Sequence, residues 1–164
     1  MTTVFLDTVG LIALWDTADQ WHSAAEGAFS SIVSQRKRML TSSFVLLECG
    51  NSAARRPYRN QISLLRRTLE DRSELIVPSE QDWRDAWDGY ERQLCGAAGI
   101  VDYVSFAVMR RLGISEAFTN DQHFVSAGFA VCAPIKYQAI ATPHIPIQTR
   151  VPRPKSAGTL SLKA

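Results

Sequence analysis

The sequence predicts an α/β fold with a parallel sheet, and two features of the chain support this. Five apolar runs of three residues recur along the chain, and longer segments with helical spacing separate most of them. Short strands without polar alternation are typical of a sheet that is covered on both faces. Strands that alternate with helices favour parallel pairing. The five expected strands are residues 4–6, 39–41, 75–77, 117–119 and 130–132.

Three helices are expected in the first half of the chain. The first carries apolar residues at helical spacing from Trp21 to Ile32. The second covers about residues 44–55, and Ser43 is a suitable N-cap for it. The third lies among many arginines and is marked by three apolar residues, Ile62, Leu65 and Leu69.

Two more helices are expected in the second half. Ser79 can cap the fourth, and Glu80 and Asp82 follow in its first turn, where the helix dipole favours acids. The fifth covers about residues 102–112 and ends at Gly113. The fourth helix has four large residues at helical spacing that we expect in the core: Trp83, Trp87, Tyr90 and Leu94.

Charge and proline divide the chain into a domain and a tail. Residues 122–164 hold 5 of the 18 basic residues and none of the 16 acidic ones. Four of the seven prolines follow Thr142, in a stretch that is poor in large apolar residues. We therefore expect one domain over residues 1–140 and a flexible, Pro-rich, basic tail over residues 141–164. Such a tail either contacts nucleic acid or is simply solvated.

The remaining composition favours a cytoplasmic protein without a membrane span. No apolar run approaches the ~20 residues that a spanning helix needs. The N-terminus MTTVFLD has no basic residue before its apolar stretch, which argues against a secretory signal. The three cysteines are widely spaced, so small buried side chains are expected rather than a zinc site or disulfides.

Four acids occupy unusual places in this pattern. Asp7 directly follows the first expected strand, and Asp121 follows the fourth by one residue. Asp102 opens an apolar helix, and Glu48 lies inside another. A single acid at a strand end is most often a helix cap, but functional groups in parallel sheets gather beyond the carboxyl ends of the strands.

If these acids converge, they need a cation. Two carboxylates ~4 Å apart repel by about 4 kcal/mol at an effective dielectric constant near 20. A cluster of oxygen ligands favours Mg²⁺ or Mn²⁺ over zinc or copper. Such an ion can activate a water molecule and stabilise charge on a phosphoryl group. The pattern therefore predicts a metal-dependent phosphodiester hydrolase.

Four segments carry a resemblance to a known family. FLDTVGLIALWD, LLECGN, VDYVSFAVMRRLGI and AFTNDQHFVSAGF are similar, in order and spacing, to segments of the PIN-domain ribonucleases. The similarity is strongest to the VapC-type toxins of bacterial toxin–antitoxin pairs and spans about residues 3–133. The last segment is the most specific, because an apolar strand is followed by Thr119, Asp121 and His123.

The resemblance implies a PIN-like fold in three layers, with a central parallel sheet of about four to five short strands flanked by helices. It implies a Mg²⁺- or Mn²⁺-dependent endoribonuclease, the toxin of a VapBC-type system. The implied partners are an RNA substrate, a cognate antitoxin protein and a second copy in a homodimer.

The same resemblance assigns roles to six residues. Asp7 and Asp102 would be the firmest metal ligands, and Glu48 and Asp121 would complete the site or position the attacking water. Two small hydroxyl residues, Thr8 and Thr119, would support the carboxylates by hydrogen bonds. As a neighbour of Asp121, His123 is expected to be structural or to support the metal ligands rather than to be catalytic.

The chain departs from the family pattern in places. Val9 stands where a small polar residue is frequent, and Gly99 replaces a usual Ser or Thr. The segment at residues 95–98 is also less polar than in most relatives. These departures put the surroundings of the acids in doubt but leave all four acids in place.

Three alternatives remain open. FLDTVG invites comparison with phosphatases of the haloacid dehalogenase type, but their second Asp is replaced here by Val9. A PIN nuclease that matures RNA without being a toxin would have the same acids. A catalytically weak PIN-like module that binds RNA or protein would be signalled by loss of an acid, and none is lost.

Overall fold

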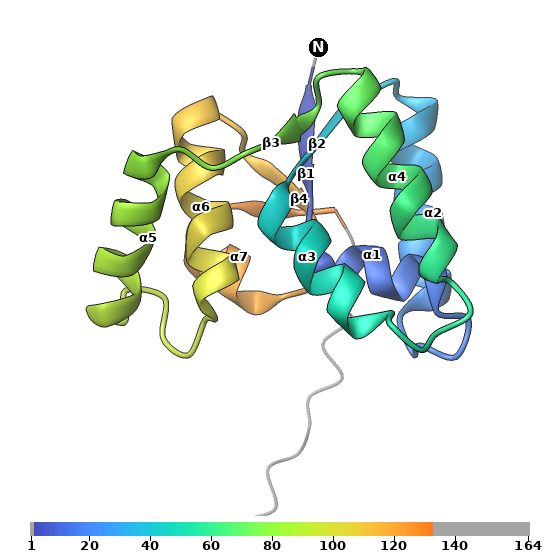
Figure 1. The fold of residues 1–164 in the computed structure, drawn as a ribbon, viewed down its shortest axis with the longest axis horizontal. Coiled ribbons are helices and arrows are strands. Elements are labelled where there is room, and N and C mark those ends of the chain that lie inside the picture. Colours follow the sequence, from blue (N-terminus) through green and yellow to red (C-terminus); the bar gives the residue numbers. More distant parts are fainter. Residues whose placement is uncertain (1, 133–164) are drawn as a thin grey trace, which may run out of the picture.

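The computed structural model describes residues 2–132 (Figure 1). The predicted tail over residues 141–164 and the predicted domain boundary at residue 140 lie outside this part of the chain. The elements, in order, are β1 (Thr3–Leu6), α1 (Thr8–Trp15), α2 (His22–Ser34), β2 (Arg38–Ser42), α3 (Ser43–Ser52), α4 (Arg59–Asp71), β3 (Leu75–Ile76), α5 (Glu80–Glu91), α6 (Ile100–Leu112), β4 (Glu116–Phe118), α7 (Gln122–Ser126) and β5 (Ala130–Val131).

All five strands pair in parallel, in the order β3-β2-β1-β4-β5. The central strand is β1, in which Phe5 lies between Leu40 of β2 and Ala117 of β4. Figure 1 shows α5 and α6 to one side of the sheet and α2 and α4 to the other. The predicted α/β class and the parallel sheet flanked by helices are confirmed, and each expected strand overlaps an observed one.

The core is centred on β1 and α6. Val4, Phe5 and Leu6 of β1 have no exposed surface. In α6, seven consecutive residues from Tyr103 to Met109 are buried, so this helix is enclosed on all sides. Burial of each large apolar side chain contributes about 1.5–3 kcal/mol. The element that carries Asp102 in its first turn is therefore firmly held.

The structure contains two helices that were not expected from the sequence. Helix α1 is apolar all round, and Asp7 is both the residue that follows β1 and the N-cap of α1. Helix α7 has only five residues, and Asp121 is its N-cap. Such segments lack the one-sided apolar stripe that marks a surface helix. The predicted cap of the second expected helix was wrong by one residue, since Ser42 rather than Ser43 accepts a hydrogen bond, from the N–H of Val45 at 3.3 Å.

The prediction that the large residues of α5 lie in the core was wrong for three of them. Trp83, Tyr90 and Leu94 are 42%, 43% and 59% exposed. Helix α5 packs mainly on α6 and lies at the outside of the fold (Figure 1), so no further layer of the described residues covers its other side. The rings instead form a row of mostly edge-to-face contacts, which starts at Phe44 of α3 and continues along α5 through Trp83 and Trp87 to Tyr90.

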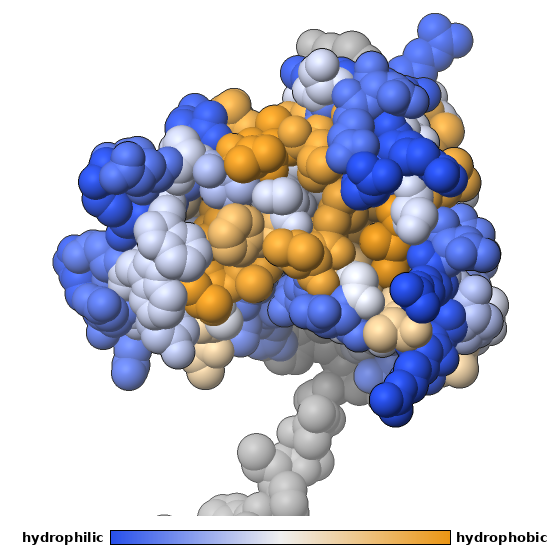
Figure 2. All heavy atoms as spheres, viewed as in Figure 1, coloured by the Kyte–Doolittle hydropathy of each residue, from blue (hydrophilic) through white to orange (hydrophobic). Residues whose placement is uncertain are grey.

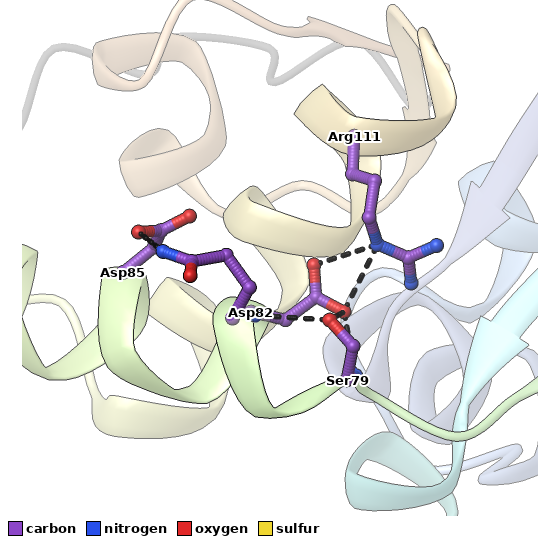
Figure 3. Close-up of polar contacts among 5 residues, drawn as sticks. Ser79, Asp82, Asp85 and Arg111 are labelled. Carbon is purple, nitrogen blue, oxygen red and sulfur yellow. Dashed lines mark hydrogen bonds and ion pairs between the residues drawn. The ribbon is translucent and has the colours of Figure 1, made fainter.

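A buried carboxylate joins α5 to α6. Asp82 accepts hydrogen bonds from Nε of Arg111 at 2.8 and 3.0 Å, as Figure 3 shows, and from the N–H and hydroxyl of Ser79 at 2.7 and 2.8 Å. Burial favours a raised pKa for Asp82, but the donors on Arg111 and Ser79 outweigh it and hold the pKa below its ordinary value. The predicted cap Ser79 is thus confirmed, and Asp82 has a structural role.

Gly10 allows α1 to approach the end of β4. A Cβ atom on Gly10 would lie 2.2 Å from the carbonyl oxygen of Phe118 and 2.8 Å from its carbon. No real contact is that short, and the backbone of a central strand cannot move away without disturbing the sheet. The absence of a side chain at Gly10 therefore sets the distance between the start of α1 and the end of β4.

Gly10→Ala should lower the free energy of unfolding by at least about 2 kcal/mol, because overpacking against backbone is not relieved by a rotamer change. Gly27→Ala is the matched control, since a Cβ atom on Gly27 in α2 would meet nothing within 4 Å. The control variant should be more stable than wild type by about 0.5–1 kcal/mol. Urea unfolding of both variants measures the difference, and equal effects would contradict this account.

Two compositional expectations can also be checked within the described part of the chain. Across residues 2–132, the helices are all too short or too polar to cross a bilayer. Cys49 and Cys95 are buried and Cys132 is half-buried, and all three are free. Burial raises the pKa of Cys49 to about 12, so its thiol stays protonated.

Candidate metal centre

The four predicted acids occupy the edge of the sheet at which its strands end. Asp7 follows β1, and Asp121 comes three residues after the end of β4. Glu48 projects from α3, and Asp102 lies in the first turn of α6. Because β1 and β4 are hydrogen-bonded neighbours, with Leu6 opposite Phe118, the residues that follow them are also adjacent.

Asp7 is held at the bottom of this site. Its side chain is buried, with Oδ2 accepting hydrogen bonds from the hydroxyl of Thr119 at 2.8 Å and from the N–H of Val9 at 3.2 Å. Burial, and to a lesser extent the nearby charge of Asp102, raises the pKa of Asp7 to about 7, although the hydrogen bonds from Thr119 and Val9 lower it. A carboxylate in this place therefore loses much of its charge unless a cation compensates it.

Asp102 is less buried than Asp7 and lies near other charged residues of the site. Its Oδ2 accepts the N–H of Gly99 at 2.8 Å. Burial raises the pKa of Asp102 to about 6, the Gly99 hydrogen bond opposes this, and the charges of Asp121 and Glu48 add to the rise. The four acids therefore lie near enough to affect one another: Asp102 raises the pKa of Asp7, and Asp121 and Glu48 raise the pKa of Asp102.

Two threonines connect the acids to the backbone. Thr8 donates a hydrogen bond to Oε2 of Glu48 at 2.5 Å, which links the start of α1 to α3. Thr119 donates to Asp7 and accepts the N–H of Asp121 at 3.1 Å. The hydroxyl of Thr119 thereby sets the relative position of two of the four acids.

The tightest group within residues 2–132 includes a histidine. One ligand atom each from Asp102, Asp121 and His123 lie within 4.8 Å of one another. Asp7 and Glu48 are not members of this group. They still interact with it electrostatically, because Asp102 raises the pKa of Asp7 and Glu48 raises the pKa of Asp102. His123 was not expected among the possible metal ligands; the signal that could have included it is its position two residues after Asp121 at the start of a short helix.

The spacing of this group depends on aromatic packing. The rings of Phe106 in α6 and Phe124 in α7 meet edge-on with centroids 4.9 Å apart, and both side chains are fully buried. This contact fixes α7, with Asp121 and His123, against the helix that carries Asp102. The Phe106–Phe124 contact therefore helps to set the distance between Asp102 and the two donors of α7.

A cleft of about 420 Å³ lies elsewhere, between α5 and α6, and contains none of the four acids. The acid cluster is the better site for chemistry, because burial, with a smaller contribution from neighbouring carboxylates, raises the pKa values of Asp7 and Asp102, and a divalent ion would favour their charged forms. Carboxylate oxygens with an adjacent imidazole are a suitable donor set for such an ion.

The chain is similar in sequence and in structure to several known proteins. The chain is 31% identical over 136 residues to the 23S rRNA-specific endonuclease VapC20 of Mycobacterium tuberculosis, and the match covers 80% of this chain and 98% of that protein. The crystal structure of VapC20, described as a sarcin–ricin loop cleaving toxin, matches with a TM-score of 0.64 and 27% identity over 77% of this chain and 96% of that one.

Two more distant structures share the fold. DNA-bound VapBC from Salmonella typhimurium matches with a TM-score of 0.56 and 17% identity, covering 80% of this chain and 97% of that one. FitAcB from Neisseria gonorrhoeae matches with a TM-score of 0.55 and 14% identity, covering 78% and 95%. The PIN domain family matches residues 4–130. The chain therefore belongs to the PIN domain family.

Proposed function

We propose that this protein is a divalent-metal-dependent endoribonuclease that acts in the cytoplasm as the toxin of a VapBC-type toxin–antitoxin system. The observation that carries the proposal is the converging acid cluster at the carboxyl edge of the sheet, in a chain that is 31% identical to a ribosomal RNA endonuclease. The ion would be Mg²⁺ or Mn²⁺, and the substrate would be RNA.

The residues of the cluster would have different roles in the reaction. A bound ion supplies Lewis acidity and lowers the pKa of water. Asp7 and Asp102 would hold the ion, and Asp121 would complete its ligands. Glu48 has one oxygen fixed by Thr8, which leaves the other able to accept a hydrogen bond from the attacking water. Hydrolysis joins the water oxygen to phosphorus and breaks the bond to the leaving ribose oxygen.

We propose two protein partners for this chain, an antitoxin and a second copy of the chain. VapBC and FitAcB are complexes, and we propose an antitoxin partner for this chain as well.

We also propose a homodimer. Figure 2 shows an apolar surface over α3, between α4 and α5. Leu47 of α3 is 66% exposed, and Val77, in the segment that leads to α5, is 76% exposed. Such a patch is typical of an interaction surface.

Asp102→Asn and Asp7→Asn should each lower the rate of metal-dependent RNA cleavage by about 100-fold or more, because several kcal/mol of transition-state stabilisation are lost. The measurement is cleavage of ribosomal RNA by partner-free protein, with Mg²⁺, with Mn²⁺ and with chelator. Asp88→Asn, at an exposed residue of α5 that pairs with Arg92, is the matched control and should cleave normally. Full activity in folded Asp102→Asn would refute the assignment.

The stability of the metal-free protein should fall as pH rises from about 4 to about 7. The pKa of Asp7 is raised from 3.8 to about 7, so the folded state keeps a proton that the unfolded state releases. The effect amounts to at most about 4 kcal/mol. Asp7→Asn removes the larger of two titrating groups and should make this slope shallower, while Asp102, whose pKa is raised to about 6, keeps the remainder. Urea unfolding with chelator at pH 5, 6 and 7.5 tests this, and parallel curves for wild type and variant would count against it.

Leu47→Glu should shift the protein from dimer to monomer, because a stable interface buries about 800 Å² per partner and does not accept an unpaired charge at its centre. Leu94→Glu is the control: Leu94 is 59% exposed but follows the far end of α5. Sedimentation velocity over a range of concentrations gives the mass. A dimer that withstands Leu47→Glu and dissociates with Leu94→Glu would place the interface elsewhere.

A further inference from the structure

One ring nitrogen beside the acid cluster has no part in the proposed function. Nδ1 of His123 is buried and lies within ion-pair distance of Asp121, but it forms no hydrogen bond with any of residues 2–132. The rest of the side chain is 35% exposed, so the imidazole lies at the boundary between the site and solvent. A buried ring nitrogen that faces a carboxylate oxygen without a hydrogen bond is unfavourable, and its presence requires an explanation.

The distance between this nitrogen and Asp121 matches the separation of two neighbouring ligands of one metal ion. Nδ1 lies 2.9 Å from Oδ1 of Asp121, yet the two atoms form no hydrogen bond. Neighbouring ligands of an octahedral ion, each ~2.1 Å from it, are about 3.0 Å apart and point toward the ion rather than toward each other. The third member of the group is an oxygen of Asp102, which lies within 4.8 Å of a ligand atom of each of the other two residues.

Local structure holds the imidazole in this place. Oδ1 of Asp121 accepts the N–H of His123 at 2.8 Å, so the carboxylate and the histidine backbone are tied together. The next residue, Phe124, is fully buried against Phe106. The backbone of the histidine therefore cannot move away from the acids without unwinding the first turn of α7.

We propose that His123 is a ligand of the divalent ion through Nδ1, together with Asp102 and Asp121, and that this nitrogen makes the site favour Mn²⁺ over Mg²⁺. The inference rests on the proposed metal-dependent function. Mg²⁺ takes oxygen ligands almost exclusively, whereas affinity for nitrogen ligands increases along the first-row transition metals.

The test is electron spin-echo spectroscopy of Mn²⁺ bound to the full-length protein, with Mn²⁺ and Mg²⁺ affinities measured alongside by calorimetry. Wild type should show nitrogen coupling from a directly bound imidazole. His123→Ala should lose this coupling and bind Mn²⁺ about tenfold more weakly, while its Mg²⁺ affinity changes less than about threefold. His123→Asn offers an oxygen near the position of Nδ1, so it should keep Mg²⁺ binding and lose the nitrogen signal.

The other two histidines provide matched controls. His22 lies in α2, where Nδ1 is hydrogen-bonded to the carbonyl of Ala13, and His144 lies outside the described residues. His22→Ala and His144→Ala should keep the coupling. If the coupling persists in His123→Ala, or is lost in a control variant instead, the inference is overturned.

The outcomes also separate this inference from the proposed function. If His123→Ala leaves the coupling and the Mn²⁺ to Mg²⁺ preference unchanged while Asp102→Asn loses metal binding and RNA cleavage, only the histidine assignment fails. If wild type binds neither ion at millimolar concentration, both the inference and the metal-dependent function fail. Circular dichroism of each variant establishes that the fold is intact before either conclusion is drawn.

Discussion

The hydrogen bond from Thr119 to Asp7 joins the two central strands at the point where each gives way to the next element. Asp7 is the only residue between β1 and α1, so the same side chain ends a strand, caps a helix and enters the acid cluster. Gly10, one turn later, lets α1 lie against the carbonyl of Phe118. The positions of α1 and β4, and through them of Glu48 and Asp121, depend on this junction.

In the metal-free protein, burying these carboxylates close together is unfavourable. Burial raises the pKa of Asp7 and of Asp102, and the neighbouring carboxylates add to this. The enclosed helix α6 and the paired rings of Phe106 and Phe124 supply enough apolar burial to hold the acids together despite their repulsion. A divalent ion would then stabilise the folded state as well as the reaction, since it binds an arrangement that the unfolded chain lacks.

The strands and the acids could be predicted from the sequence for a simple reason. A doubly covered parallel sheet needs short apolar strands, and acids that directly follow such strands must lie at its carboxyl edge. The exposure of Trp83 and Tyr90 could not be predicted, because helical spacing shows that residues share a face but not whether a further layer covers it. Helix α1 was missed because it is apolar on every side.

His123 shows where the limit of such a prediction lies. Its spacing from Asp121 is visible in the sequence, but the position of its ring depends on how α7 packs through Phe124 onto α6. Only that packing brings the imidazole to the oxygens of Asp102 and Asp121. Acids at strand ends are placed by the sheet, whereas a ligand on a short helix is placed by tertiary contacts. The part of the site that distinguishes one metal from another therefore depends on the core, not on the motif.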